Sequence, residues 1–242
     1  MAHKATHSSW QSWSNMAAQC LEKPHDQLAI IDLTGDARRD VSFGDLVDMT
    51  DGLARYLMAR VVPGDRVGVL LSQSPWCAAA HLAIWKIGAI SVPLFKLFKH
   101  DALASRVGDA GCALVLTDAE GAVLLGDLAP SALAAEVGQD GDEVRYAEAG
   151  PQTPCVLIYT SGTTGAPKGA LHGHGVLAGH IPGVALSHDH LGQPGDCLWT
   201  PADWAWIGGL FDVLMPGLAL GVPVIAGPGG QIFCENLCSC GD

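Results

Sequence analysis

Short apolar runs alternate with longer amphipathic stretches along the first half of the chain. The short runs are rich in β-branched and aliphatic residues and are bounded by glycine, proline or aspartate, a pattern typical of buried strands separated by turns. We expect strands at residues 28–33, 40–42, 67–71, 89–92 and 113–116. The first two flank the turn Gly35-Asp36 and predict a hairpin.

Helical periodicity fills the intervals between these runs. Ser42 is the expected N-cap of a helix whose apolar residues, from Phe43 to Leu57, fall on one face. Ser74-Pro75 predicts a second helix that runs to Ile87 and stops at Gly88. Further helical signals begin at Asp101 and lie around Val123 and Leu133. Strand, helix, strand in this order predicts an α/β fold with parallel pairing and helices on both faces of the sheet.

A different pattern follows the apolar run at 155–158. Segment 159–169 reads YTSGTTGAPKG, in which hydroxyl side chains and glycine N–H groups can converge on anionic oxygens and Lys168 adds a positive charge. The spacing differs from the Walker phosphate loop, which needs four residues between its glycines and then Gly-Lys-Ser/Thr. Pro167 and Gly169 disfavour a helix here, so we expect Lys168 on a loop leading into a second strand, Gly169 to His172. A flexible linker would not need Lys and Pro at set places after a buried strand.

Residues 139–154 are rich in Gly, Asp, Glu and Pro and form a candidate boundary. The expected organisation is a first α/β subdomain at 1–150, the start of a second subdomain carrying the phosphate loop at 151–230, and a tail at 231–242. Cysteine density rises abruptly in the tail, which predicts that it is out of frame.

Segment 159–169 resembles the signature of the AMP-forming adenylating enzymes, which include acyl-CoA synthetases, peptide-synthetase adenylation domains and luciferases. Residues 61–69 and 83–94 resemble the segments that precede this signature in acyl-CoA synthetases. The resemblance implies the N-terminal part of the large domain of these enzymes, with layered, mostly parallel sheets and flanking helices. It gives contacts with the β- and γ-phosphates of ATP to Thr160, Ser161, Gly162, Thr163, Thr164, Gly165 and Lys168.

A second cluster, TPADWAWIGG at 200–209, has two interpretations. It could be a buried aromatic pair at the start of a helix. By resemblance to an Asp-x-Gly-Trp-like element of acyl-CoA synthetases, it would instead form the wall of an acyl and pantetheine pocket, although Ala205 stands where that element usually has glycine. The residues concerned are Asp203, Trp204, Trp206 and Gly208.

The reaction implied by the resemblance has two steps. A carboxylate attacks the α-phosphorus of ATP to give an acyl-adenylate and pyrophosphate, and a thiol, usually coenzyme A, then takes the acyl group. Mg²⁺ and Lys168 would neutralise the phosphates, and none of the loop residues is a covalent nucleophile. The expected small-molecule partners are a carboxylate, ATP and coenzyme A.

The resemblance extends over residues 25–230, and the later elements that hold adenine, ribose and the catalytic lysine are not found. We therefore expect no complete catalytic set and no acyl-CoA formation by this chain alone, with apolar surface exposed around Val222, Val224 and Ile225. Two alternatives remain open. The chain could be a nucleotide- or partner-binding module without ligase chemistry, or a fragment of an amino-acid adenylation domain.

Composition narrows the class of protein. The 242 residues are 49% hydrophobic, enough for a large core, and the net charge of -12 argues against a nucleic-acid surface. Residues 204–227 carry one charge but are interrupted by prolines and glycines, which favours a buried helix and strand over a transmembrane segment.

The eight cysteines predict reduced thiols in a cytoplasmic protein, because five are scattered and no secretory segment is evident. Cys234, Cys238 and Cys240 suggest a metal site, but their spacing lacks paired C-x-x-C ligands, and we expect no bound metal there.

Overall fold

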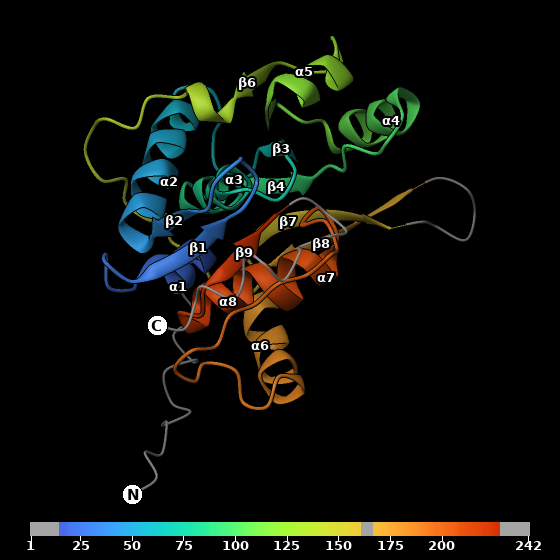
Figure 1. Ribbon diagram of the computed structural model, residues 1–242. Helices are drawn as coiled ribbons and strands as arrows, with labels where there is room; N and C mark the ends of the chain where they lie inside the picture. The colour runs from blue at the N-terminus through green and yellow to red at the C-terminus, as the bar shows by residue number, and fades with distance from the viewer. Residues whose placement is uncertain (1–14, 161–166, 228–242) are drawn as a thin grey trace, which may run out of the picture.

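A computed structural model describes residues 15–160 and 167–227 of the protein. Its larger sheet has six strands in the order β6-β5-β3-β4-β7-β8, and a smaller sheet has the order β2-β1-β9 (Figure 1). The strands are β1 Leu28–Asp32, β2 Arg39–Ser42, β3 Arg66–Leu70, β4 Ile90–Pro93, β5 Leu114–Thr117, β6 Ser131–Leu133, β7 Pro154–Thr160, β8 Lys168–Gly173 and β9 Val224–Ala226.

Helices pack on both faces of the larger sheet. The helical elements are α1 Met16–Leu21, α2 Phe43–Met58, α3 Pro75–Lys86, α4 His100–Ala110, α5 Ala119–Leu125, the 3-10 turn η1 Ala134–Glu136, α6 Val176–Ser187, α7 Ile207–Gly209, the π-helical turn η2 Leu210–Leu214 and α8 Met215–Leu220. Side chains of α4 and α5 share one core cluster with β3, β4 and β5, whereas α1, α2, α3 and α8 belong to a second and larger cluster. The larger cluster also takes in the small sheet, so α2 and α3 lie between the two sheets.

Local sequence signals explain how the two central helices begin. Ser42 and Asp45 form a reciprocal capping box at the start of α2. The Ser74 hydroxyl accepts a hydrogen bond from the Cys77 N–H, 3.2 Å away, and Pro75 occupies the first turn of α3. Nearly every residue of α3 is buried, as expected for a helix that is apolar all round.

The topology confirms the expected α/β class. Strands β3, β4, β5, β6 and β7 pair in parallel, and β8 pairs antiparallel to β7. The hairpin at 28–42 is also confirmed as β1 and β2. Strands β7 and β8 follow the expected boundary at 150–151 and continue the same sheet, and the division into subdomains stays a prediction.

Two expectations are wrong. The helical signal at Leu133 lies instead at the end of β6, because residues 131–133 pair with β5 and complete the sheet edge before η1 begins. The apolar surface expected around Val222, Val224 and Ile225 is buried, with exposures of 3%, 0% and 3%. Strand β9 pairs in parallel with β1, and Val222 and Val224 belong to the larger core cluster.

Among the described cysteines, Cys20, Cys77 and Cys155 are buried free thiols, Cys112 is half-buried and Cys197 is exposed. Burial raises the pKa of the Cys20 thiol to about 12, which keeps it protonated and unreactive. Within residues 15–160 and 167–227, no three His, Cys, Asp or Glu side chains are placed to hold a metal ion. The cysteines of the tail lie outside the described residues. None of the described helices has the length and apolar character needed to cross a bilayer.

Candidate functional site at the carboxyl edge of the sheet

The phosphate-loop segment connects β7 to β8 as a hairpin. Thr160, the last residue of β7, pairs with Lys168, the first residue of β8, and both are exposed. Gly169 pairs with Tyr159, and a Cβ at this position would lie 2.9 Å from the Leu157 Cδ1 on the neighbouring strand. Ser161, Gly162, Thr163, Thr164 and Gly165 lie outside the described residues. The expected second strand is confirmed, and it begins at Lys168 itself.

Because β7 runs parallel to β4, its carboxyl end lies at the same edge of the sheet as those of β3 and β4. Helix α3 leaves β3 toward one face and α5 leaves β5 toward the other, although β3 and β5 are neighbours. In open α/β sheets, ligands bind where adjacent strands send their connections to opposite faces. The arrangement marks this edge as the candidate site.

A cavity of about 730 Å³ opens at this edge. Its walls come from the segments after β3 and β4, the start of α5 and the segment before α7. They are lined by Thr34, Ser72, Gln73, Phe95, Lys96, Leu97, Glu120, Pro201, Ala202, Asp203, Trp206 and Gly227. The Phe95 and Trp206 rings meet edge to face with centroids 5.6 Å apart, so one wall is aromatic.

The segment 200–206 is tied to the sheet by Gln73. The Gln73 Nε2 donates to the carbonyl oxygens of Thr200 and Ala202, at 3.1 and 2.6 Å. Among the described residues its buried Oε1 has no hydrogen-bond partner, which leaves an acceptor beside the cavity. Sequence reasoning did not identify Gln73, since its partners lie more than a hundred residues away.

The structure separates the four residues predicted for the acyl and pantetheine pocket. Asp203 and Trp206 line the cavity. Trp204 is fully buried in the core, and Gly208, two residues after Trp206, is not among the lining residues. The Asp203 Oδ1 accepts the Ala205 N–H at 2.8 Å. Burial raises the pKa of the Asp203 carboxyl despite this hydrogen bond and the nearby positive charge of Lys96. The binding role of all four residues stays a prediction.

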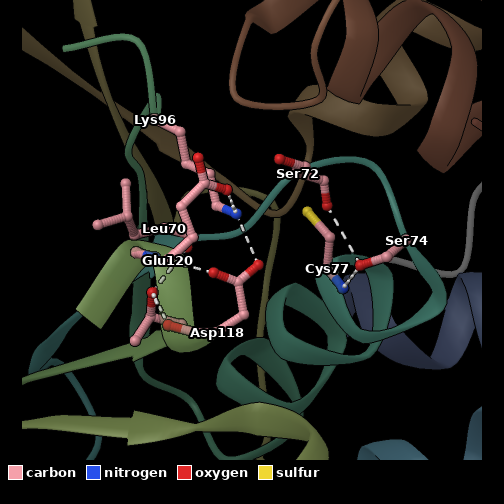
Figure 2. Close-up of polar contacts among 9 residues, drawn as sticks. Leu70, Ser72, Ser74, Cys77, Lys96, Asp118 and Glu120 are labelled. Atoms are coloured by element: carbon pink, nitrogen blue, oxygen red, sulfur yellow. Dashed lines mark hydrogen bonds and ion pairs between the residues drawn. The ribbon is translucent and has the colours of Figure 1, made fainter. Parts of the chain in front are cut away.

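Figure 2 shows a charged group at the cavity that the sequence analysis did not find. The Lys96 Nζ donates to Asp118 Oδ2 at 2.6 Å and to Glu120 Oε2 at 2.8 Å. Desolvation acts to lower the pKa of Lys96, but the hydrogen bonds to Asp118 and Glu120 outweigh it and raise the pKa above its usual value. Asp118 also caps α5 by accepting the Gly121 N–H at 2.9 Å. The sequence held one signal for this charged group. Lys96 and Asp118 each follow a predicted parallel strand, and the carboxyl ends of these strands lie at the same edge of the sheet.

Comparison with known proteins places the chain in a family. The sequence model of the AMP-binding enzyme family matches residues 16–235. Acetyl-coenzyme A synthetase of Alkalilimnicola ehrlichii is 32% identical over 254 aligned residues, which cover 87% of this chain and 39% of that protein. The human acetyl-coenzyme A synthetase 2-like, mitochondrial protein is 30% identical, with 81% and 34% covered.

A solved structure agrees with these sequence matches. The acyl-CoA synthetase of Brucella canis superposes with a TM-score of 0.79 at 25% identity, covering 94% of this chain and 45% of that one. The chain spans about two-fifths of the length of the curated relatives it matches. The sequence signature at 159–169, the parallel sheet and the family match agree, and the chain belongs to the AMP-binding enzyme family.

Proposed function

We propose that this region serves ATP-dependent activation of a carboxylate in an AMP-forming acid-thiol ligase of the acyl-CoA synthetase type. The product of the first step would be an acyl-adenylate, and coenzyme A would then accept the acyl group as a thioester. Membership of the AMP-binding family and similarity to acetyl-coenzyme A synthetases support the proposal. The observation that carries it is the Thr160 and Lys168 pair at the carboxyl edge of the sheet.

The physical difficulty of the first step is charge, because an anionic carboxylate must approach a polyanionic triphosphate. The exposed Lys168 ammonium and Thr160 hydroxyl stand across one hairpin, a donor set that fits phosphate oxygens. The other residues proposed to bind the β- and γ-phosphates are Ser161, Gly162, Thr163, Thr164 and Gly165. Bound Mg²⁺ would supply further neutralisation of the phosphates.

The cavity beside Trp206 would hold the acyl group and the pantetheine arm of coenzyme A. Its aromatic wall suits an apolar chain, and the free acceptor of Gln73 suits an amide N–H. Asp203 and Trp206 are the proposed contacts from the predicted set, with Gly208 next to them along the chain. Trp204 would act from the core by supporting this segment, since its side chain is fully buried.

The first experiment measures MgATP binding to the 242-residue chain by calorimetry. Lys168→Ala removes a charge-assisted contact, so affinity is expected to fall roughly 10- to 100-fold. The matched control is Lys99→Ala, which removes an exposed lysine that no described contact places at the site. Equal affinity of the two variants would contradict the phosphate assignment.

The second experiment tests the chemistry. Residues 16–227 replace the corresponding region of the Alkalilimnicola ehrlichii synthetase, and carboxylate-dependent exchange of pyrophosphate into ATP is measured with acids of increasing length. We expect exchange that Lys168→Ala reduces and Lys99→Ala does not. A folded chimera that binds MgATP but exchanges pyrophosphate with none of the acids would overturn the ligase proposal, and exchange with amino acids alone would favour an amino-acid adenylation domain.

A further inference from the structure

The cavity of about 730 Å³ holds one positive charge among its described lining residues, the ammonium group of Lys96. Its other charged lining groups are the carboxylates of Glu120 and Asp203. The proposed function places the pantetheine arm of coenzyme A in this cavity, and that arm ends in a phosphate where it joins the nucleotide. A phosphate at the cavity needs a cation, and Lys96 follows β4 at the edge of the sheet where the cavity opens.

Lys96 already has two anionic partners, which differ in how firmly they are held (Figure 2). Asp118 is fixed at the start of α5, because its Oδ1 accepts the Gly121 N–H at 2.9 Å while its Oδ2 accepts from Lys96. Gly121 packs so closely on the sheet that a Cβ there would lie 2.8 Å from the Leu70 carbonyl oxygen. The start of α5, and with it Asp118, therefore has little freedom to move away from Lys96.

Glu120 is the weakly held partner. Its side chain is 73% exposed, and among the described residues its side-chain hydrogen bond is the one from the Lys96 Nζ, 2.8 Å from its Oε2. An ion pair with a solvent-exposed carboxylate contributes little free energy, because water solvates the carboxylate when it leaves. The Lys96 ammonium has three N–H donors, so release of Glu120 leaves two for a ligand while Asp118 keeps the third.

We propose that Lys96 binds the phosphate at the end of the pantetheine arm, and that Glu120 occupies this phosphate position until the thiol substrate binds. The inference rests on the proposed function, since it names the group of the thiol substrate that the same cavity recognises. A phosphate monoester or a diphosphate offers more negative charge and more acceptor oxygens than one carboxylate, so it displaces Glu120 from Lys96. Asp118 and Asp203 stay in place, because each is bonded to a backbone N–H of its own segment. Glu120 thus competes with the phosphate and limits how tightly the thiol binds.

The test measures binding of three thiols to the 242-residue chain by ligand-observed NMR: pantetheine, which has no phosphate, 4′-phosphopantetheine and coenzyme A. The parent protein is expected to bind phosphopantetheine about three- to tenfold more tightly than pantetheine, as for one charge-assisted hydrogen bond. Lys96→Met should abolish this preference. Glu120→Gln should raise the affinity for both phosphorylated thiols about two- to fivefold and leave that for pantetheine unchanged, because a neutral amide competes less well for Lys96.

Two further variants separate a competing contact from a general effect of charge. Glu120→Asp keeps the negative charge but shortens the side chain, so the contact with Lys96 is lost and the affinity for phosphopantetheine should rise as in Glu120→Gln. Asp101→Asn removes an exposed carboxylate of α4 that no described contact joins to Lys96, and it should leave all three affinities as in the parent. The urea midpoint of each variant checks that it folds.

Equal binding of pantetheine and phosphopantetheine to the parent, a preference that persists in Lys96→Met, or an affinity that Glu120→Gln does not raise would each overturn the inference. A rise in Glu120→Gln that Asp101→Asn matches and Glu120→Asp lacks would do the same, since charge alone would explain it. If pantetheine binds every variant alike while the phosphate preference is absent, the proposed pantetheine cavity stands and only this inference fails. Binding of none of the three thiols to the folded chain contradicts both, whereas MgATP binding in the same samples reports separately on Lys168.

Discussion

Two lysines show how differently this protein uses ion pairs between a lysine and a carboxylate. Lys86 of α3 is fully buried between the sheets, with its Nζ 2.5 Å from the Asp51 Oδ1 and 4.5 Å from the Tyr146 ring centroid. Lys96 lies at the cavity, where its partners Asp118 and Glu120 have 43% and 73% of their side chains exposed. The first pair is sealed and therefore structural, whereas the second remains open to water and to a ligand.

The largest effect on the free energy of unfolding is expected when Lys86 is replaced. Lys86→Met leaves the buried Asp51 carboxylate with only the Val144 N–H, 3.3 Å away, as a described partner. Removing one partner of a buried ion pair typically costs about 3–5 kcal/mol, so the urea midpoint should fall sharply. The double variant Lys86→Met with Asp51→Leu should recover most of this loss. A loss of under about 1 kcal/mol in the single variant would mean that the pair is not sealed in solution.

A buried histidine of α3, His81, should resist protonation in the folded protein, and the pH dependence of unfolding can measure this. His81 of α3 is 1% exposed, and burial lowers its pKa to about 3. Between the unfolded value of about 6.5 and the folded value, the unfolded chain binds a proton that the folded chain does not. The stability present above the unfolded pKa is therefore lost as pH falls through this window, by up to about 1.4 kcal/mol per pH unit from this residue.

The variant His81→Leu isolates this contribution. It should flatten the dependence of the urea midpoint on pH in this window, and His100→Leu, at an exposed histidine, should leave the dependence as it is in the parent protein. His174 adds a similar contribution, since burial lowers its pKa to about 4. An identical pH slope in His81→Leu and the parent would refute the assignment.

The smallest effect on stability is expected at the open pair. Lys96→Met removes an ion pair with solvent-exposed partners, so the free energy of unfolding should change by less than about 1 kcal/mol. Asp118 keeps its hydrogen bond to Gly121, which preserves the start of α5. The change should appear instead in coenzyme A binding at the adjacent cavity, measured by calorimetry. A stability loss comparable to that of Lys86→Met would erase the distinction between the two pairs.

The same contrast separates what the sequence could and could not predict. Ser42, Ser74 and the alternation of apolar runs are local signals, and the helices and strands they predicted are present. Trp204 and Trp206 are two residues apart with the same chemistry, yet one is fully buried and the other half-exposed. No local pattern distinguishes them, because burial depends on the core formed by distant helices.

Long-range partners account for the remaining omissions. The Lys96, Asp118 and Glu120 group joins segments more than twenty residues apart. The expectation of exposed apolar surface near Val224 failed for the same reason, since the partner strand lies near residue 30. Sequence periodicity identifies which face of an element is apolar, but not which other element covers it.

The pairing of β9 with β1 has a consequence for how the chain folds as it is synthesised. The Gln27 Nε2 donates to the Gly221 carbonyl, 194 residues further along, at the same place where Ile30 pairs with Val224. At about 5–20 residues per second, a ribosome needs roughly 10–40 s to make the intervening chain. During that interval the edge of β1 that later pairs with β9 has no partner strand. The small sheet is thus the last part of this region that can close, and its open edge would be the natural contact for a chaperone on the nascent chain.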